Sequence, residues 1–160
     1  MPLLRPVSDH DLADVLALNH RNVALLAPMD EDRFHVLRGW ADRFDVVESD
    51  GAFAGFVVTF GPGSPYDSEN YRWFAERHEH GFYYLDRIVL HEDFRRQGLG
   101  GFVYDVLERH AARHDRLSLE VNLVPRNDAS LAFHARRGYD EVGRLGDQRH
   151  LVTMLEKTFR

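Results

Sequence analysis

The hydrophobic positions in the first sixty residues predict two helices and a hairpin. Ser8 and Asp11 form the pattern of an N-cap ahead of apolar residues that follow at helical spacing from Leu12 onward. A second helical stretch runs from Glu31 to Trp40. The dipeptide Asp50-Gly51 suits the left-handed angles of a tight turn and therefore predicts a hairpin. Strands are expected at residues 3–6, 44–48 and 53–60.

Residues 61–81 contain glycine, proline and serine at short intervals, which predicts a long loop. A loop of this length in a compact domain is often functional, and disorder is the competing explanation. Its aromatic residues indicate that the segment covers another part of the molecule: Tyr66, Tyr71, Trp73 and Phe74.

The second half of the chain alternates strands and helices. After an apolar strand that ends near Leu90, apolar residues at i, i+3, i+4, i+7 and i+8 predict a helix from Leu99 to about His110. Alternating apolar and polar residues at 117–122 predict a half-buried strand. A short helix follows, with Asn127 or Asp128 as its N-cap and Gly138 at its end. The final strands are expected at residues 139–145 and 151–159.

The composition is that of a soluble globular protein and excludes several kinds of site. The 160 residues are 44% hydrophobic and 29% charged, and no run approaches the ~18 apolar residues of a membrane span. The absence of cysteine excludes disulfides, thiolate zinc sites and a cysteine nucleophile. The N-terminus lacks a charged leader followed by an apolar stretch. We therefore expect one domain over residues 1–160, located in the cytoplasm, with no membrane partner.

The net charge of −6 argues against nucleic acid as a partner and favours a cationic acceptor. Acidity that only serves solubility is an equally good explanation. Two histidine pairs, His78 with His80 and His110 with His114, have spacings that can bind zinc. Because no third ligand is indicated, we expect solvated histidines and no metal.

The segment LDRIVLHEDFRRQGLGG, which ends at Gly101, joins a strand to a glycine-rich turn that opens a helix. Backbone N–H groups at a helix start have no acceptor inside the helix, so a phosphate chain is their natural ligand. Glycine at positions 98 and 100 permits close approach of a pyrophosphate. A glycine turn that merely starts a packed helix is the alternative. A dinucleotide fingerprint would need glycine in place of Val103, and a P-loop would need Gly-Lys, whereas the only lysine is Lys157.

This segment resembles the acyl-CoA-binding motif of the GNAT superfamily of N-acetyltransferases. The resemblance implies an α/β (α+β) fold, with a mixed central sheet of about six to seven strands flanked by about four helices. Homodimers are common in that superfamily. The resemblance also implies that coenzyme A is bound by two groups of residues. Its pyrophosphate would contact Arg96, Gln97, Gly98, Leu99, Gly100 and Gly101, and its pantetheine and thioester would lie along Ile88, Val89 and Leu90.

A second stretch, EVNLVPRNDASLAFHARRGY, resembles another GNAT pattern. Asn127 matches the asparagine with which the family binds coenzyme A. Where the family usually has a tyrosine that protonates the departing thiolate, this chain has His134. An imidazole that contacts the sulfur or relays a proton through water is our hypothesis, and a surface histidine that fills the space of the tyrosine is the alternative.

Transfer of an acyl group to an amine also requires a group that removes a proton. An alkyl amine with a pKa near ~10.4 is neutral in only about one part in 10³ at pH 7. Glu120 matches a position used as the base in some GNAT enzymes, and Asp86 lies on the strand expected to bind the thioester. Two structural roles are the alternatives, an ion pair of Asp86 with Arg87 and a hydrogen-bond acceptor at Glu120. The resemblance to the GNAT superfamily also implies that a backbone N–H near Val89 or Leu90 would meet the developing oxyanion.

Together these features predict an N-acetyltransferase that moves an acetyl group from acetyl-CoA directly to a primary amine of a small molecule or peptide. A non-catalytic acyl-CoA-binding or regulatory module on the same fold is the first alternative. A structural protein that binds phosphate is the second.

Overall fold

The computed structural model describes residues 1–159, which form a seven-stranded sheet and five α-helices. In chain order the elements are β1 (Pro2–Pro6), α1 (Leu12–Arg21), α2 (Glu31–Trp40), β2 (Arg43–Ser49), β3 (Ala52–Phe60), α3 (Glu69–His78), β4 (Tyr83–Leu90), α4 (Leu99–Ala111), β5 (Arg116–Val124), α5 (Asp128–Arg136), β6 (Asp140–Gly146) and β7 (Leu151–Thr158). None of the helices in residues 1–159 is long and apolar enough to cross a membrane.

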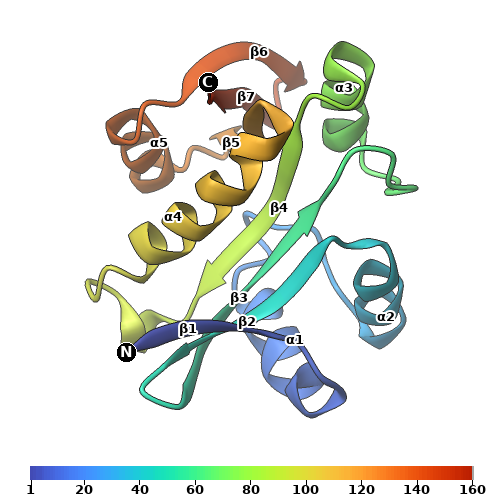
Figure 1. The fold of residues 1–160 in the computed structure, drawn as a ribbon. Helices are drawn as coiled ribbons and strands as arrows, with labels where there is room; N and C mark the ends of the chain where they lie inside the picture. Colours follow the sequence, from blue (N-terminus) through green and yellow to red (C-terminus); the bar gives the residue numbers. More distant parts are fainter. Residues whose placement is uncertain (160) are drawn as a thin grey trace.

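The sheet has the order β1-β2-β3-β4-β5-β7-β6, and its one parallel contact lies between β4 and β5 (Figure 1). These two strands pair only at Tyr83 with Leu117 and at Tyr84 with Ser118. Every other neighbouring pair in the sheet is antiparallel. The predicted fold class, α/β with a mixed sheet, is therefore confirmed. Beyond Tyr84 and Ser118 the two central strands separate, which leaves backbone groups of both facing the space between them.

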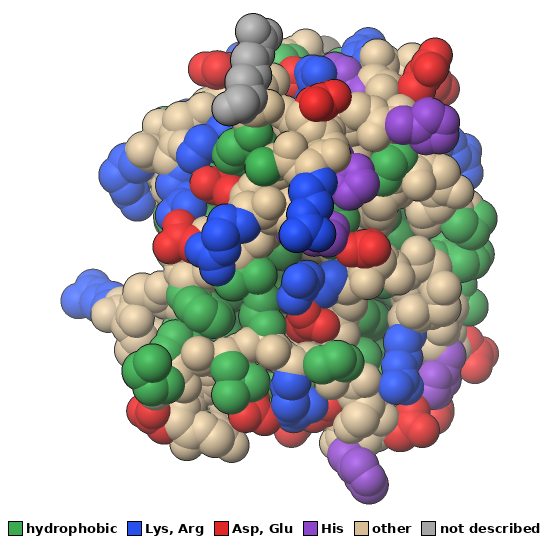
Figure 2. Space-filling view, in the orientation of Figure 1, with side chains coloured by type: hydrophobic (Ala, Val, Ile, Leu, Met, Phe, Trp, Pro, Cys, Tyr) green, Lys and Arg blue, Asp and Glu red, His purple; other side chains and the backbone are tan. Residues whose placement is uncertain are grey.

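One face of the sheet is covered by α4 and α5, and α4 crosses the front of the molecule in Figure 1. The apolar stripe predicted along α4 is buried there, with Val103 and Leu107 fully enclosed. On the outer surface, acidic and basic side chains are interspersed over the face drawn in Figure 2. The helix ends at Ala111, in agreement with the predicted end near His110.

The local signals read from the sequence are confirmed at several turns. Ser8 and Asp11 form a capping box ahead of α1, through a short 3₁₀ turn at Asp9–Asp11. Asp50 and Gly51 have φ angles of 51° and 83°, as a tight hairpin requires. Gly138 has a φ of 87° just after α5, where the left-handed conformation ends a helix.

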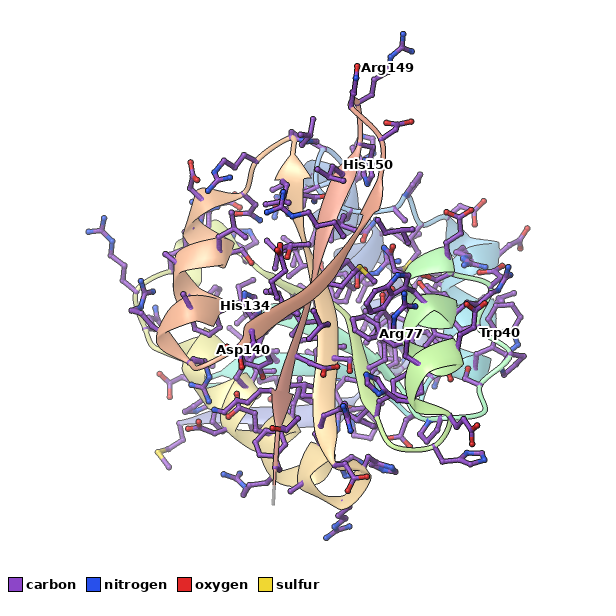
Figure 3. All side chains as sticks on the ribbon, turned by 90° about the horizontal axis from the view of Figure 1, so that it is seen from above. Trp40, Arg77, His134, Asp140, Arg149 and His150 are labelled. Carbon is purple, nitrogen blue, oxygen red and sulfur yellow. The ribbon has the colours of Figure 1, made fainter. Side chains whose placement is uncertain are left out.

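The prediction of a long loop at residues 61–81 is wrong, because residues 69–78 form α3. Ser68 caps this helix by accepting a hydrogen bond from the Tyr71 amide. One side of α3 lies against β6, where a Cβ on Gly143 would stand 2.4 Å from the Trp73 ring. Arg77 lies 3.3 Å over the same ring, and Figure 3 shows it on α3. The helix was missed because most of its residues are polar and only a narrow side with aromatic residues is buried.

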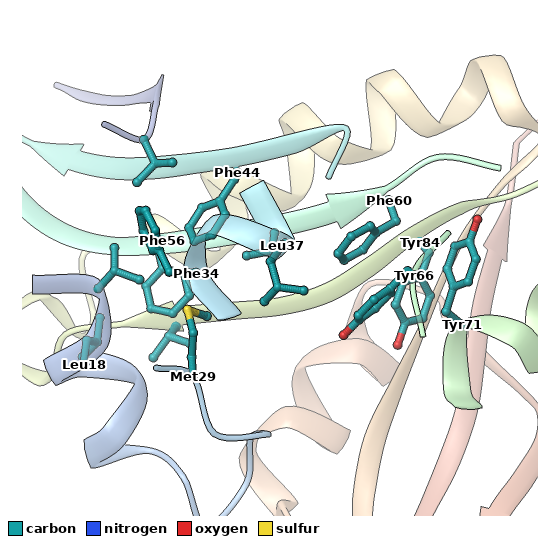
Figure 4. Packing of buried hydrophobic residues seen from close by; sticks show 14 of the residues in the cluster. Leu18, Met29, Phe34, Leu37, Phe44, Phe56, Phe60, Tyr66, Tyr71 and Tyr84 are labelled. Atoms are coloured by element: carbon teal, nitrogen blue, oxygen red, sulfur yellow. The ribbon is translucent and has the colours of Figure 1, made fainter. Parts of the chain in front are cut away.

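The opposite face of the sheet carries α1, α2 and α3 over an aromatic core (Figure 4). Alternate residues of β3 point into it, among them Phe56 and Phe60, which are fully buried. Burying each such side chain contributes roughly 1.5–3 kcal/mol. The Tyr66 ring stacks on Phe60 with ring centroids 3.9 Å apart. This stacking anchors the chain between β3 and α3 and directs the Tyr66 hydroxyl toward β4.

Candidate active site

A cavity of about 740 Å³ lies where β4 and β5 separate. Its walls include Ile88, Val89 and Leu90 from β4, and Leu119 and Glu120 from β5. The loop between α1 and α2 contributes residues 22–28, and the start of α5 contributes polar side chains. The cavity therefore brings together Asp86, Ile88, Val89, Leu90, Glu120, Asn127 and His134, which the sequence had placed in one site.

Glu120 is half-buried in this cavity and accepts hydrogen bonds from neutral groups. The Tyr84 hydroxyl lies 2.7 Å from both carboxylate oxygens, and Asn70 Nδ2 lies 3.1 Å from Oε1. Burial, followed by the nearby charge of Asp86, raises the pKa of Glu120 to about 8, against the opposing effect of these hydrogen bonds. A carboxylate with this pKa takes up and releases protons near neutral pH.

Asp86 has a side chain only 7% exposed, and its carboxylate is occupied by two donors. Arg87 Nε lies 2.6 Å from Oδ2, and the Tyr66 hydroxyl donates to Oδ1 at 2.5 Å. Arg87 itself also donates to Asn19 and to the Ala27 carbonyl. The ion pair considered from the sequence is thus present, and it holds the Asp86 carboxylate beside Glu120.

His134 is buried, at 4% exposure, and does not lie on the helix surface (Figure 3). Its Nδ1 lies 2.7 Å from the Ser130 carbonyl, and its Nε2 lies 2.6 Å from the Tyr104 hydroxyl. Because a carbonyl can only accept, Nδ1 carries the proton and Nε2 accepts from Tyr104. Burial is the main reason that the pKa of His134 is lowered, so the imidazole is neutral at physiological pH.

Asn127 is the N-cap of α5, as predicted, and its side-chain oxygen accepts from the Ser130 amide at 3.2 Å. The same side chain lines the cavity, so its Nδ2 group is the part that can donate to a ligand.

The glycine turn lies apart from the cavity lining, at the start of α4. Arg96 and Gly98 have φ angles of 64° and 74°, which turn successive amides toward one side. The first bond inside the helix runs from the Phe102 amide to the Gly98 carbonyl, so the amides of residues 99–101 have no acceptor within the helix.

The packing of this turn tests whether it can receive a phosphate chain. A Cβ on Gly98 would meet no atom within 4 Å, and one on Gly100 would touch only the Phe133 ring at 3.8 Å. The fold itself therefore leaves these positions open, which fits a pyrophosphate seated on the exposed amides. The Leu99 side chain is buried at 3% exposure and anchors the turn, while the Ser49 hydroxyl donates to the Gln97 side chain at 3.3 Å.

Several residues that hold the side chains of the candidate site were not identified from the sequence. Tyr84 and Asn70, which hold Glu120, and Tyr104, which holds His134, are the main ones. Tyr84 lies in an apolar run that reads as core, and Asn70 lies in the segment mistaken for a loop. Tyr104 lies four residues after Gly100, and this helical spacing is the signal that could have placed it on the buried side of α4.

Metal binding finds no geometric support in the described part of the chain, where no three His, Asp or Glu side chains are arranged to hold an ion. The prediction of solvated histidines is wrong for His78, whose ring lies 2.8 Å from Glu156 with its side chain 16% exposed. His110 lies 3.6 Å from Asp42, and its ring lies tilted against that of His114 with centroids 5.6 Å apart.

Comparison with known proteins identifies the family of this chain. Residues 10–139 match the family described as the Acetyltransferase (GNAT) family. A search of curated proteins by sequence returned no match.

Solved structures share the fold over nearly the whole chain. Ard1 from Thermoplasma volcanium superposes with a TM-score of 0.76 at 16% identity, covering 99% of this chain and 98% of that one. The ribosomal-protein-S18-alanine N-acetyltransferase from Escherichia coli gives a TM-score of 0.71 at 20% identity, covering 99% and 94%. An N-acetyltransferase from Staphylococcus aureus Mu50 gives 0.71 at 17% identity, covering 100% and 99%. With the family match spanning most of its length, this chain belongs to the GNAT family of acetyltransferases.

Proposed function

We propose that this protein transfers an acetyl group from acetyl-CoA directly to a primary amine. The observation that carries the proposal is Glu120, a carboxylate with a pKa of about 8 held by neutral donors in the cavity between β4 and β5. Such a group can accept the proton that an incoming ammonium must lose. The names of similar structures as N-acetyltransferases support an amine acceptor.

The donor side of the proposal rests on the open turn at the start of α4. The amides of Leu99, Gly100 and Gly101 and the residues Arg96, Gln97 and Gly98 would bind the pyrophosphate of coenzyme A. The separated edge of β4 at Ile88, Val89 and Leu90 would hydrogen-bond the pantetheine, and Asn127 would donate to it through Nδ2. The thioester bound there would supply the activated acetyl group.

On the acceptor side, Glu120 acts as the general base and Asp86 raises its basicity. Arg87 pairs with Asp86, and the nearby Asp86 carboxylate disfavours the ionised form of Glu120. Glu120 takes a proton from the amine, whose lone pair then attacks the carbonyl carbon. A backbone N–H near Val89 or Leu90 stabilises the resulting oxyanion.

On the leaving-group side, His134 acts through Tyr104. In the imidazolium form, Nε2–H donates to the Tyr104 oxygen, which frees the Tyr104 hydroxyl proton for the thiolate sulfur. Transfer of both protons leaves neutral imidazole, neutral tyrosine and the free thiol. The proton that converts His134 to its imidazolium form comes from solvent, because the imidazole is neutral before the reaction.

A thiol-release assay with acetyl-CoA and a panel of amines tests the function. We expect amine-dependent release of coenzyme A and an acetylated product detected by mass spectrometry. Binding of acetyl-CoA without turnover on any amine would instead support the non-catalytic module. If acetyl-CoA raises the Tm and pyrophosphate does not, the protein is an acetyltransferase or an acyl-CoA-binding module and not a simple phosphate-binding protein.

A further inference from the structure

The charged side chains that line the cavity are almost completely paired with one another. The lining contains three carboxylates, Asp67, Asp86 and Glu120, and two guanidinium groups, Arg33 and Arg87. Arg33 binds Asp67 through two bonds of 2.6 and 3.0 Å, and Arg87 binds Asp86 at 2.6 Å. Within the described residues, Glu120 is the lining carboxylate that has no cation within 4.0 Å. Glu120 is therefore the carboxyl group of the lining that a ligand can contact without displacing an arginine.

Neither guanidinium is available to a carboxylate on the acceptor. The Arg87 side chain is 4% exposed and its donors are directed at Asp86, Asn19 and the Ala27 carbonyl. Arg33 is fixed by Asp67 and lies 5.8 Å over the Tyr66 ring. An acceptor that carries a carboxylate beside its amine, such as a free amino acid, would find no free guanidinium to pair with it.

A second ammonium on the acceptor would also lack a partner. Two carbonyl oxygens of the loop over the cavity are already bonded, since Leu25 accepts from Asn122 at 3.1 Å and Ala27 accepts from Asn19 at 3.0 Å. The same loop presents Val23 and Leu25 at the cavity with 41% and 39% of their surface exposed. Uncharged side chains next to the reacting amine can pack there.

These contacts lead to an inference that rests on the proposed function and names its acceptor. We propose that the acceptor is the α-amine at the N-terminus of a peptide or protein whose first side chains are uncharged. In such a chain the neighbouring carboxylate is an amide, and the only charge near the reacting nitrogen is its own ammonium. The backbone groups exposed where β4 and β5 separate can bond the peptide groups that follow.

The acidity of Glu120 fits the same acceptor. Its pKa of about 8 matches the value of roughly 7.7–8.0 for an α-amine, so the proton transfer between them is nearly balanced. For a lysine side-chain amine, with a pKa near 10.4, the same transfer is unfavourable by about 250-fold.

A panel of four amines tests the inference: Ala-Ala-Ala-amide, free alanine, Nα-acetyl-lysine amide and spermidine. We expect kcat/KM to be highest for the tripeptide amide, by at least about 30-fold over each of the others. Equal or better use of acetyl-lysine amide, spermidine or alanine overturns the acceptor assignment while leaving the acetyltransferase function intact. Absence of turnover on all four, and on a broader amine set, while acetyl-CoA still raises Tm, removes the proposed function and the acceptor with it.

The substitution Asp67→Asn provides a second test, because it releases Arg33 at a half-exposed position without touching Glu120. The freed guanidinium should bind the carboxylate of alanine, so the kcat/KM ratio of alanine to alaninamide should rise by about 10-fold. Asp9→Asn removes a comparable surface pair, that with Arg38, and neither residue lines the cavity, so the ratio should stay unchanged. If the ratio is unchanged in Asp67→Asn, the claim that the cavity excludes carboxylates because its arginines are paired is wrong.

Discussion

The Tyr104 hydroxyl donates a 2.6 Å hydrogen bond to Nε2 of His134, although the two residues are 30 positions apart and lie on different helices. Tyr104 is 3% exposed and His134 is 4% exposed, so water does not compete for this bond. With Nδ1 bonded to the Ser130 carbonyl, the imidazole has no free N–H. Any proton that His134 gives to a ligand must therefore pass through Tyr104.

The replacements His134→Ala, His134→Tyr and Tyr104→Phe test this pairing. We expect Ala at 134 and Phe at 104 to lower kcat by a similar factor of about 10–100, since each interrupts the same transfer. The dissociation constant for acetyl-CoA should change little. His134→Tyr should change the pH dependence of kcat, because a phenol replaces an imidazole. Unchanged pH profiles in both His134 variants would reject a catalytic role for this residue.

Replacing Glu120 with Gln removes the proposed base. We expect kcat/KM to fall by about 10²–10⁴-fold, with acetyl-CoA binding retained, because the amine then keeps its proton. In the unmodified protein, kcat/KM should rise with pH up to about 8, the pKa of Glu120. Glu156→Gln is the matched control, since this carboxylate on β7 is held by His78 and Arg116 outside the cavity. A wild-type rate in Glu120→Gln would contradict the assignment.

The same Glu120→Gln variant should be more stable than the wild type at high pH. The pKa of Glu120 is raised from 4.5 to about 8 on folding, so the folded protein holds a proton that the unfolded chain releases. The free energy of unfolding must then fall as pH rises from 4.5 to 8, by up to about 5 kcal/mol. Glutamine removes this loss, so the Tm difference between variant and wild type should grow across that range. A constant difference would contradict the raised pKa.

The fold could be predicted from the sequence because its elements carry local signals. Asp50-Gly51, the cap at Ser8 and the apolar stripe of α4 each determine structure through a few neighbouring residues. The glycine turn at the start of α4 was predictable for the same reason, since its glycines and the helix start are contiguous. The helix α3 was not, because its stability depends on Trp73 packing against β6, which lies far away in the chain.

The partners of the candidate catalytic groups also could not be read from the sequence. Tyr84 reaches Glu120 across the two parted strands, and Tyr104 reaches His134 from another helix. Hydrogen bonds of this kind join residues with no fixed spacing, so only the folded chain reveals them. For the same reason the sequence did not reveal that His134 is buried, and this burial lowers its pKa.

The contact between α3 and β6 can be measured directly. Gly143→Ala would put a methyl group 2.4 Å from the Trp73 ring, so the helix must shift or the ring must leave its position. We expect a loss of about 1–3 kcal/mol of stability in denaturant unfolding. In a double-mutant cycle with Trp73→Ala, the two losses should be non-additive because the methyl then fits. Additive losses would place the strain elsewhere.

The glycine turn at the start of α4, where we propose that the pyrophosphate binds, offers a test in which stability and binding should move in opposite directions. Gly100→Ala introduces a side chain in the first turn of α4, where the nearest atoms belong to the Phe133 ring at 3.8 Å. The free protein should therefore keep its stability or gain up to about 1 kcal/mol, as alanine favours a helix over glycine. The affinity for acetyl-CoA should fall by about 10-fold or more, because the added methyl obstructs the approach of the pyrophosphate to the amides. Gly39→Ala in α2 is the control, since a Cβ there also meets nothing within 4 Å and no ligand is expected nearby. Calorimetric titration of both variants with acetyl-CoA measures this difference. Equal affinities would contradict the proposal that the pyrophosphate binds at this turn.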